Sequence, residues 1–486
     1  MIQAESETGR EAVDIFRRFV SFEQEHGLFE LYADGVPIWG RIRNVVGSRL
    51  QQRRQYDDTE RSPDTSAFDP NQLLRDAKNT AGRLLGKVEA VRPAPLWADE
   101  AEYLFWGRSR RSLGPDGLWW DIYCDILHER LEYDYVHVER PKGVRHLRPA
   151  KTERLYYLDL LDDVAALGER FSTTDGTLPS RTREQLVEVE RLLAAEFGEE
   201  IDVTGIAEAE LRERRRLGDA YRWLVERIDP EVAVALLAGN RRPMLEACAD
   251  ADIPTVEFQH GLTSPYHYGY SFPETVDGRG FPDYFFSFGD YWTEVCEFPY
   301  PDDRVRTVGF PHLEAGLERY AGVDDRPQVV FVSQETVGTP LSKAAAALSD
   351  SPRIDADVVY KLAWAEKGKW RSAYPWLADA DVRVIDDETQ LYRLFAESTV
   401  QVGVYSTAVF EGLAFDLETY LLDLPGIHHM EPLIEETDVR LCGSTTELVD
   451  AVADGDAGEV DTRQFFEPDA VENVRRELER VRTAHE

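Results

Sequence analysis

Short apolar segments alternate with helical segments over the second half of the chain, and this alternation limits the possible fold more than any other feature. Residues 232–239 read VAVALLAG and residues 328–334 read QVVFVSQ, and turn-forming or polar residues flank both. Continuous apolar strands, without an alternating polar face, are typical of parallel sheets that helices cover on both faces. The sequence therefore predicts an α/β fold from about residue 230 onward.

Further segments extend this pattern. Strands are expected at 135–138, 255–261, 283–290, 305–311, 358–364, 382–386, 400–406 and 418–426, and helices at 181–229, 244–249, 340–348, 390–397, 407–415, 448–453 and 471–481. The series divides near 312–327, which predicts two Rossmann-like domains that face a cleft. We expect an N-terminal domain over 101–315 and a C-terminal domain over 316–486 that ends in a closing helix.

Residues 1–100 show a different pattern, which predicts an extra helical region followed by a linker. Apolar side chains have roughly helical spacing over 13–22, and Trp39 and Ile42 lie on one side of a helix over 36–50. We expect this second helix to pack on the main body, and contact with a membrane surface is the alternative. The polar residues 51–72 predict a linker or a long surface loop.

Acidic residues dominate the surface that this chain can present. It has 92 Asp and Glu against 55 Lys and Arg, a formal net charge of −37, and only 8 of its cations are lysines. This composition resembles that of proteins from salt-loving archaea, since about 1 M salt shortens the Debye length to roughly 3 Å and screens the repulsion. We interpret the acidity as a solvated surface in brine, with a site for a basic partner as the alternative. A nucleic-acid partner is not expected, because phosphate backbones need a basic face.

Four isolated cysteines and the lack of targeting signals predict a cytoplasmic protein. Cys124, Cys248, Cys296 and Cys442 form no CxxC pair, so we expect neither a zinc knuckle nor a redox motif. No signal peptide is evident, and no apolar stretch reaches the ~18 residues of a membrane span. We expect no metal and no cofactor.

Polar residues follow the strand expected at 255–261, and the carboxyl ends of parallel strands are where such sheets bind ligands. Gln259, His260 and Gly261 end this segment, and His267 follows it. Imidazole titrates near neutrality, so His260 can serve as a general base or contact a phosphate, and Gly261 permits the close approach of a ligand. A loop histidine that caps backbone groups is the alternative interpretation.

The C-terminal half repeats this placement after three of its expected strands. The candidate binding residues are Ser333, Gln334 and Thr336 after the first strand, Lys361 at the end of the second, and Tyr405, Ser406, Thr407 and Glu411 after the third. Glu335, also after the first strand, is a candidate catalytic residue. Hydroxyl and amide groups, a lone cation and a helix N-terminus all suit a phosphate, and a carboxylate one turn into the helix suits ribose hydroxyls. Ordinary helix caps and solvated charges are the alternative.

Taken together, these segments resemble a known family. The matching stretches are VEFQHGLTSPYHYGYSFP (256–273), FPDYFFSFGDYW (281–292), RVRTVGFPHLE (304–314), VSQETVG (332–338), YKLAWAEKGKW (360–370), VGVYSTAVFEGLAF (402–415) and LPGIHHMEPL (424–433). Their order and spacing over roughly 230–455 resemble those of GT-B-type glycosyltransferases of surface polysaccharide and glycan assembly, akin to capsule polysaccharide transferases. GxGxxG, Walker, HExxH and GxSxG motifs are absent.

The resemblance implies a GT-B-like fold in which the C-terminal domain binds a nucleotide sugar and the acceptor lies against the N-terminal domain. It implies that Gln259, His260 and Gly261 border the cleft, that Ser333, Gln334 and Thr336 approach the donor phosphates, that Ser406 and Thr407 hold the diphosphate, and that Glu411 contacts the ribose or the sugar. Two positions depart from the family pattern. Relatives commonly carry Lys-Leu-His-Pro where this chain has Lys361-Leu362-Ala363-Trp364, and they tend to have Gly where Glu335 stands.

Three functions remain open on the sequence. The first is glycosyl transfer from a nucleotide sugar to a lipid-linked or saccharide acceptor in surface-glycan or N-glycan assembly, in the cytoplasm or at the cytoplasmic face of the membrane, with His260 as the base. The second is a sugar or sugar-nucleotide isomerase or epimerase, in which His260 with Glu335 or Glu257 forms an acid/base pair. The third is a non-catalytic scaffold of a glycan-assembly complex. Fold alone decides none of these.

We expect the protein to be more stable at high salt than in dilute buffer, because screening weakens the repulsion among its excess negative charges. The midpoint of thermal unfolding, followed by circular dichroism, should rise as KCl increases from about 0.1 M to about 1 M, over which the Debye length falls from ~10 Å to ~3 Å. A midpoint that stays constant or falls over this range would contradict the interpretation of the acidic surface.

Overall fold

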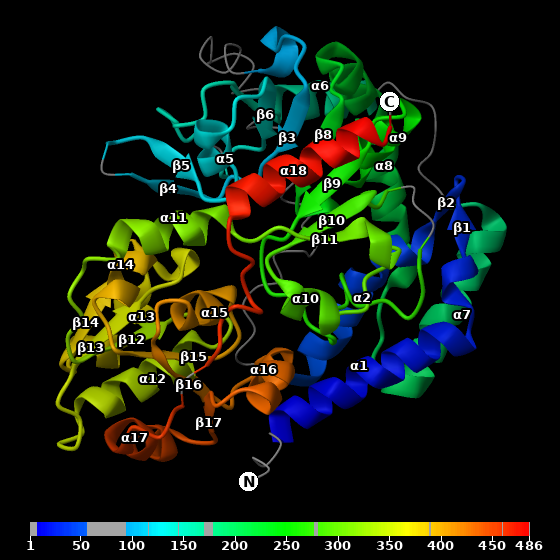
Figure 1. Ribbon diagram of the computed structural model, residues 1–486. Helices are drawn as coiled ribbons and strands as arrows, with labels where there is room; N and C mark the ends of the chain where they lie inside the picture. The colour runs from blue at the N-terminus through cyan, green and yellow to red at the C-terminus, as the bar shows by residue number, and fades with distance from the viewer. Residues whose placement is uncertain are drawn as a thin grey trace.

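The computed structural model describes residues 7–55, 94–114, 116–143, 145–169, 178–276, 280–387, 390–458 and 460–485. Within them, two parallel β-sheets lie in separate halves of the molecule, and helices cover both sheets (Figure 1). The predicted α/β class with two Rossmann-like domains is therefore confirmed. Most of the linker expected over 51–72 lies outside the described residues, and residues 51–55 end a helix.

The first sheet has seven strands, and all of its pairs are parallel. Its order is β11 (Val305–Thr307), β10 (Tyr284–Ser287), β9 (Thr255–Phe258), β8 (Val232–Leu236), β3 (Tyr103–Trp106), β6 (Tyr135–Glu139) and β7 (Leu155–Tyr157). β3 and β7 were not predicted from the sequence. A short antiparallel hairpin of β4 (Arg111–Leu113) and β5 (Trp119–Asp121) follows β3.

The second sheet has six strands, also paired in parallel throughout. Its order is β14 (Val382–Ile385), β13 (Asp357–Lys361), β12 (Gln328–Val332), β15 (Val400–Gly403), β16 (Glu418–Leu422) and β17 (Arg440–Cys442). The sequence predicted every strand of this sheet except the edge strand β17. Nearly all residues of β12, β15 and β16 are buried, as their continuous apolar sequences indicate.

Both sheets are wound in the same way. The chain builds the first sheet from β3 outward to β6 and β7, and then returns to the other side of β3 with β8. It builds the second from β12 outward to β13 and β14, and returns with β15. Open parallel sheets bind ligands outside the carboxyl ends of the strands where the order reverses. The β3/β8 and β12/β15 boundaries are therefore the positions at which a site is expected.

Helices pack on both sheets and form the N-terminal region. The first domain has α5 (Asp125–Arg130), α6 (Asp159–Glu169), α7 (Ser180–Phe197), α8 (Val203–Ile228), α9 (Arg242–Asp250) and α10 (Asp290–Glu294), and α11 (Pro311–Tyr320) leads to the second. The second domain has α12 (Gly338–Ser349), α13 (Trp370–Ala373), α14 (Leu391–Ala396), α15 (Thr407–Leu413), α16 (Glu431–Glu436) and α17 (Thr445–Asp454). Of the helices that the structure describes, none has the length and apolarity to cross a membrane.

The N-terminal helices α1 (Glu7–Glu25) and α2 (Ile38–Gln55), which flank the small hairpin of β1 (Tyr32–Ala33) and β2 (Val36–Pro37), pack on the first domain. Ile38, Trp39, Ile42 and Val46 are at most 1% exposed and share an apolar cluster with α7 and α8. The prediction that this helix packs on the main body is therefore confirmed. Because its apolar face is buried in protein, the alternative in which this face lies on a membrane is wrong.

A buried ion pair connects α1 and α2 to the loop after β9. Arg43 donates to the two carboxylate oxygens of Glu23 at 2.7 and 2.8 Å, and neither side chain is exposed. The same guanidinium donates to the carbonyl oxygens of Tyr268 at 2.5 Å and Ser271 at 2.8 Å. The N-terminal helices therefore fix the conformation of the chain that follows β9.

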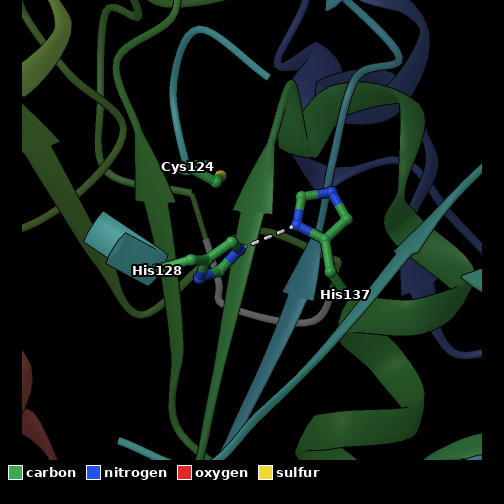
Figure 2. A group of neighbouring side chains, drawn as sticks. All are labelled: Cys124, His128 and His137. Atoms are coloured by element: carbon green, nitrogen blue, oxygen red, sulfur yellow. Dashed lines mark hydrogen bonds between the residues drawn. The ribbon is translucent and has the colours of Figure 1, made fainter. Parts of the chain in front are cut away.

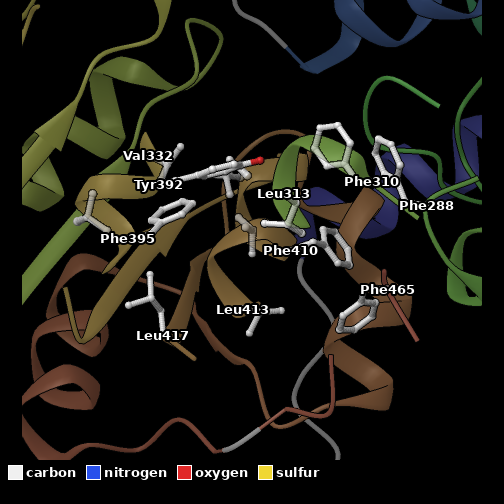
Figure 3. Close-up of a cluster of buried hydrophobic side chains, with 14 of the residues drawn as sticks. Phe288, Phe310, Leu313, Val332, Tyr392, Phe395, Phe410, Leu413, Leu417 and Phe465 are labelled. Atoms are coloured by element: carbon white, nitrogen blue, oxygen red, sulfur yellow. The ribbon is translucent and has the colours of Figure 1, made fainter. Parts of the chain in front are cut away.

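Aromatic side chains join the two domains into one core. The ring of Phe410 on α15 lies 4.5 Å from that of Trp292 on α10 and 5.1 Å from that of Phe465. Phe288 and Phe310 of the first domain stack beside them at 4.4 Å (Figure 3). These residues belong to one apolar cluster that also includes strands of both sheets, so the two domains share buried surface.

The chain returns to the first domain at its C-terminal end. The Trp292 indole N–H donates to the carbonyl oxygen of Phe465 at 2.8 Å. The closing helix expected at 471–481 forms as α18 (Ala470–Thr483) and lies over the first sheet beside β8 and α5 (Figure 1). Leu478 and Val481 are buried there. The C-terminal segment therefore connects the second domain back to the first.

We expect Glu23→Gln to lower the free energy of unfolding by about 3–5 kcal/mol, because it leaves the buried Arg43 charge uncompensated. Urea denaturation in concentrated salt measures this. The matched control is Glu188→Gln, which removes an exposed pair with Arg191 at 2.5 Å on α7 and should change stability little. Equal effects of the two substitutions would show that the buried pair does not hold the N-terminal helices in place.

Candidate functional site

The candidate site lies where the carboxyl ends of the two sheets meet. Arg108 and Arg110 follow β3, His260 and Gly261 follow β9, and Thr407 begins α15 after β15. A Cβ atom placed on Gly261 would lie 3.9 Å from Thr407 Oγ1. Gly261 follows β9, the neighbour of β8, and Arg110, which follows β3, acts on Glu411 of α15. The carboxyl ends beside the two strand-order reversals therefore face each other at the domain boundary.

Two arginines of the first domain place positive charge at this boundary. Arg110 donates to the Tyr123 hydroxyl at 3.1 Å, and that hydroxyl donates to the carbonyl oxygen of His260 at 2.6 Å. Arg108 is exposed and makes no hydrogen bond or ion pair with any described residue. No ion pair within the described residues neutralises either Arg108 or Arg110. The two arginines can therefore donate to a bound anion at this boundary, where the Glu411 carboxyl also acts on Arg110.

These arginines were not among the residues predicted from the sequence, because the strand β3 that precedes them was not predicted. The residues are YLFW at 103–106, followed directly by GRSRR at 107–111. Four apolar residues are a weak strand signal, yet β3 is the strand from which the first sheet is wound. A buried strand followed at once by three arginines was the signal that could have found them.

His260 is held in one tautomer by a chain of hydrogen bonds. The Tyr270 hydroxyl donates to Glu257 Oε1 at 2.7 Å, and its oxygen lies 3.3 Å from His260 Nδ1. Because the hydroxyl proton points to the carboxylate, Nδ1 carries a proton and donates to the Tyr270 oxygen. Nε2 then keeps its lone pair. This atom has no partner among the described residues and is not sealed from solvent, so it can accept a proton.

Burial and charge keep the imidazole of His260 neutral. Burial lowers the pKa of His260 well below its ordinary value, and Arg108 and Arg110 lower the pKa further. Burial also raises the pKa of Glu257 to about 7. An anion bound to the two arginines would offset their field and raise the pKa of His260. The imidazole therefore becomes a stronger base when an anion is bound.

Glu411 approaches the same place from the second domain, one turn after Thr407 on α15. Burial raises the pKa of the Glu411 carboxyl, while the nearby Tyr392 hydroxyl and Arg110 oppose this rise. The preceding residue, Phe410, is fully buried in the core between the domains (Figure 3). Helix α15 is therefore anchored by Phe410 while Thr407 and Glu411 remain at the boundary.

Two predicted binding residues use their amide groups to join neighbouring strands. Gln259 accepts from the backbone N–H of Phe288 at 2.8 Å and donates to the carbonyl oxygen of Gly261 at 3.0 Å. Gln334 accepts from the backbone N–H of Tyr405 at 3.0 Å and donates to the carbonyl oxygen of the same residue. Both amides shape the strand ends at the site, and the substrate contacts predicted for them stay a prediction.

Two predicted serines also bond within the second domain. Ser333 is buried and lies 2.8 Å from both the Tyr360 hydroxyl and Glu366 Oε1. Ser406 accepts from the backbone N–H of Ala408 at 3.2 Å and caps α15, which is the alternative that its sequence position offered. The hydroxyls of these residues therefore already have partners in the fold.

The carboxylate beside His260 is that of Glu257, whose Oε1 lies 3.8 Å from His260 Nδ1. Glu335, which the sequence analysis named as a catalytic partner, is exposed and forms no hydrogen bond or ion pair with described residues. Its charge acts on Tyr374 of the second domain. Of the two acids considered for a pair with His260, the structure brings Glu257 to it.

Two further predicted residues lie along the carboxyl edge of the second sheet. Thr336 Oγ1 is 2.8 Å from the Tyr405 hydroxyl. Lys361 Nζ donates to the carbonyl oxygen of Asp387 at 3.4 Å, towards the β14 edge of the sheet. Thr336 and Tyr405 thus lie beside α15, whereas Lys361 lies near the end of a more distant strand.

Histidines close to the candidate site also link the two domains, and the ring of His429 lies 5.7 Å from that of Tyr405. The hydrogen bonds between the domains in this region include Ser264 to His429 at 2.7 Å, Gln51 to His428 at 2.9 Å, and Tyr266 to Glu431. The ring of His267, a predicted binding residue, lies 6.3 Å from that of His429, and His267 Nδ1 accepts from the backbone N–H of Gly269 at 3.0 Å. These contacts fix the loop after β9 against the second domain.

A cavity of about 570 Å³ lies elsewhere, between α6 and α8 of the first domain. Leu96, Leu161, Val164 and Trp223 are among its apolar lining residues, and Arg212 and Arg216 are also in its wall. It shares no residue with the site at the domain boundary.

No protein-family model matches the sequence, and no curated protein matches it. Among solved structures, the chain is similar to UDP-GlcNAc 2-epimerase from Neisseria meningitidis (12% identity, TM-score 0.46, 78% of this chain and 99% of that one). It is also similar to UDP-N-acetylglucosamine 2-epimerase from Rickettsia bellii (10% identity, TM-score 0.45, 79% of this chain and 95% of that one). A third similar structure is MurG from Acinetobacter baumannii (9% identity, TM-score 0.45, 78% of this chain and 99% of that one). At such low identities and TM-scores, function does not follow from the likeness.

We expect stability to fall as pH falls from about 6.5 to about 4. Burial lowers the pKa of His267 and of His428 to about 4 from 6.5, so the folded state binds fewer protons than the unfolded state in this window. Each histidine then costs up to about 1.4 kcal/mol of unfolding free energy for each pH unit. Urea denaturation at a series of pH values measures the slope.

The variant His428→Gln should show a shallower loss over the same window. Buried acids with raised pKa values act in the opposite sense. Glu257, whose pKa is raised to about 7, contributes stability that is lost as pH rises towards 7. Comparing variant with wild type isolates the contribution of His428. Identical slopes for wild type and variant would contradict the role given to the buried neutral imidazole.

Proposed function

We propose that this chain is a glycosyltransferase that transfers a sugar from a nucleotide sugar to a lipid-linked or saccharide acceptor. We place this activity in the assembly of a surface glycan or a glycoprotein N-glycan, in the cytoplasm of a salt-loving archaeon or at the cytoplasmic face of its membrane. The observation that supports this most directly is that Arg108 and Arg110, which have no carboxylate partners among the described residues, lie at the same domain boundary as Thr407 and Glu411.

This arrangement suits a nucleoside diphosphate bound to a sugar. The two guanidinium groups offer N–H donors to the phosphate oxygens, and arginine is well matched to phosphate geometry. The Thr407 hydroxyl at the start of α15 adds a donor from the second domain. Glu411 can accept hydrogen bonds from the hydroxyls of ribose or sugar. The diphosphate would thus be held by both domains.

In the proposed reaction, His260 Nε2 accepts the proton of an acceptor hydroxyl. The acceptor oxygen forms a bond to the anomeric carbon, and the bond from that carbon to the donor phosphate oxygen breaks. The electron pair leaves with the nucleoside diphosphate, whose added negative charge Arg108 and Arg110 stabilise. Because the bound diphosphate raises the pKa of His260, the base gains strength when the donor is in place.

A sugar-nucleotide epimerase is the second candidate, and one observation favours it. Glu411 and His260 lie on opposite domains, and burial favours the protonated carboxyl of the first and the neutral imidazole of the second. An epimerase needs an acid and a base on either side of one carbon. The two candidates share the donor site and differ in the bond that breaks.

Binding is tested by thermal unfolding in concentrated salt with UDP, GDP, dTDP, CMP and their common sugar conjugates. We expect one nucleotide to raise the midpoint, and Arg110→Gln and Thr407→Ala to reduce the shift. Loss of a hydrogen bond from Arg110 to a charged phosphate should weaken binding by about 10- to 100-fold. The matched control is Arg191→Gln, on the exposed face of α7, which should leave the shift unchanged.

Product analysis with the stabilising nucleotide sugar separates the candidates. Transfer releases the nucleoside diphosphate, whereas epimerisation keeps the nucleotide sugar and incorporates deuterium from D2O at a carbon. We expect the wild-type protein to release the nucleoside diphosphate. The variant His260→Gln should no longer release it. If no nucleotide raises the unfolding midpoint, a nucleotide sugar is not the donor. The non-catalytic scaffold would then be the remaining function.

A further inference from the structure

A cysteine and two histidines meet in the interior of the first domain, away from the groups that face the domain boundary. Cys124 lies at the start of α5, His128 lies one turn later, and His137 lies in the middle of β6 (Figure 2). One potential ligand atom of each residue lies within 4.8 Å of those of the other two. Cys124 and His137 are at most 1% exposed, so water does not satisfy these groups.

The two imidazoles already face each other at a distance that suits a metal. His128 Nε2 and His137 Nδ1 are 3.1 Å apart. Two nitrogen ligands of tetrahedral zinc, with Zn–N bonds of about 2.0–2.1 Å, lie about 3.3 Å apart.

The outer nitrogens of both rings face suitable second partners. His128 Nδ1 lies 3.0 Å from the Tyr133 hydroxyl. His137 Nε2 lies 3.8 Å from Glu139 Oε2 and has no hydrogen bond, although it is buried. Metal-bound histidines commonly turn the other ring N–H to a carboxylate or a similar acceptor, which fixes the tautomer. Metal coordination at the facing nitrogens would place both remaining protons on these outer atoms.

The charge of the surroundings favours an additional cation. Asp121, Asp125 and Glu139 are at most 1% exposed, and Arg111 is the cation that pairs with this group within the described residues. Three carboxyl groups therefore share one guanidinium. A divalent ion with one thiolate ligand adds a single positive charge beside them.

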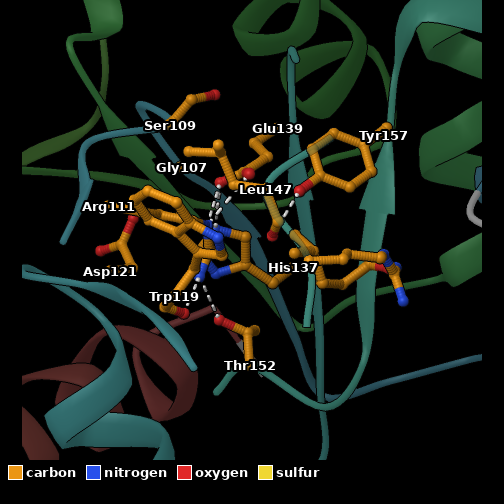
Figure 4. Close-up of polar contacts among 12 residues, drawn as sticks. Gly107, Ser109, Arg111, Trp119, Asp121, His137, Glu139, Leu147, Thr152 and Tyr157 are labelled. Carbon is orange, nitrogen blue, oxygen red and sulfur yellow. Dashed lines mark hydrogen bonds and ion pairs between the residues drawn. The ribbon is translucent and has the colours of Figure 1, made fainter. Parts of the chain in front are cut away.

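A second possible group, Asp121, His137 and Glu139, is less suited to a metal because Arg111 already occupies it (Figure 4). The Arg111 guanidinium lies 3.0 and 3.1 Å from the Glu139 oxygens and 2.9 Å from Thr152 Oγ1. An ion among these carboxylates would have to displace a buried guanidinium. The Cys124, His128 and His137 group contains no such cation.

We propose that Cys124 Sγ, His128 Nε2 and His137 Nδ1 bind one zinc ion. Sulfur and imidazole nitrogen are the ligands that tetrahedral zinc prefers, and these residues supply three of its four positions. The thiol gives up its proton on coordination. Since the neighbouring Tyr123 links Arg110 to the carbonyl oxygen of His260, the ion would hold the start of α5, and with it Tyr123, in place. It is a structural ion, and its presence does not depend on the function proposed for the boundary.

The test uses the untagged full chain, stripped with a chelator and reloaded with zinc or cobalt. We expect one zinc per chain by mass spectrometry of the metal, and a thiolate-to-cobalt charge-transfer band in the near ultraviolet with cobalt. The variant Cys124→Ser should lose this band. The matched control, Cys248→Ser, changes another buried cysteine in a different apolar cluster of the same domain and should keep the band.

The wild-type chain alone decides the main point, even where a variant fails to fold. A folded wild type that takes up no stoichiometric zinc and shows no thiolate-to-cobalt band would overturn the proposal. A folded Cys124→Ser that keeps the full band would overturn the ligand assignment. His128→Gln provides the second variant, and it should lower zinc affinity at least tenfold while retaining the far-ultraviolet circular dichroism of the wild type.

Discussion

The packing of Phe410 between Trp292 and Phe465 is the contact on which the arrangement of the two domains depends. Trp292 belongs to the first domain, Phe410 to α15 of the second, and Phe465 to the segment that leads back to the first. Because α15 has only seven residues, the side chain that anchors it is adjacent to Glu411 and three residues from Thr407. The apolar contact therefore sets the distance across which the two strand-order reversals face each other. A small displacement of this helix would separate Thr407 from Gly261.

The chain is acidic overall, yet two arginines without ion pairs among the described residues lie at the candidate site. The chain has a large acidic excess, and many of its arginines pair with carboxylates, whether exposed, as in Arg191 with Glu188, or fully buried, as in Arg43 with Glu23. Arg108 and Arg110 depart from this pattern at the place where the fold expects a ligand. At high salt, long-range attraction between exposed charges is screened, whereas hydrogen bonds from a guanidinium to a bound anion act at contact distance. Recognition of an anion by these arginines is therefore compatible with an acidic surface suited to brine.

The sequence predicted the parallel strands of the second domain well, because segments such as 328–334 and 400–406 are continuous apolar runs between polar residues. It missed β3, a run of four residues, and with it the arginines that follow. The hydrogen-bond partners of the candidate side chains could not be predicted from the sequence either. Ser333 bonds to Tyr360 and Glu366, and Gln334 to Tyr405, through contacts between strands that local patterns do not specify. His260 and Gly261 could be placed at the site because a strand end and a glycine are local features, whereas the Tyr270 contact that fixes the imidazole tautomer is not.

The role of the N-terminal helices, which the sequence left open, follows from the contacts of their buried ion pair with the loop after β9. The Arg43 charge is neutralised by Glu23, and its Nη1 donates to the carbonyl oxygens of Tyr268 and Ser271 in the loop that begins at Gly261. From the other side, the Tyr123 hydroxyl donates to the carbonyl oxygen of His260. The chain around the imidazole is thus held by its backbone from two directions, by groups about 220 residues before the loop and about 140 residues before His260. Backbone carbonyls held in this way leave the His260 side chain free to meet a ligand, and this explains why a segment outside both sheets belongs to the architecture of the site.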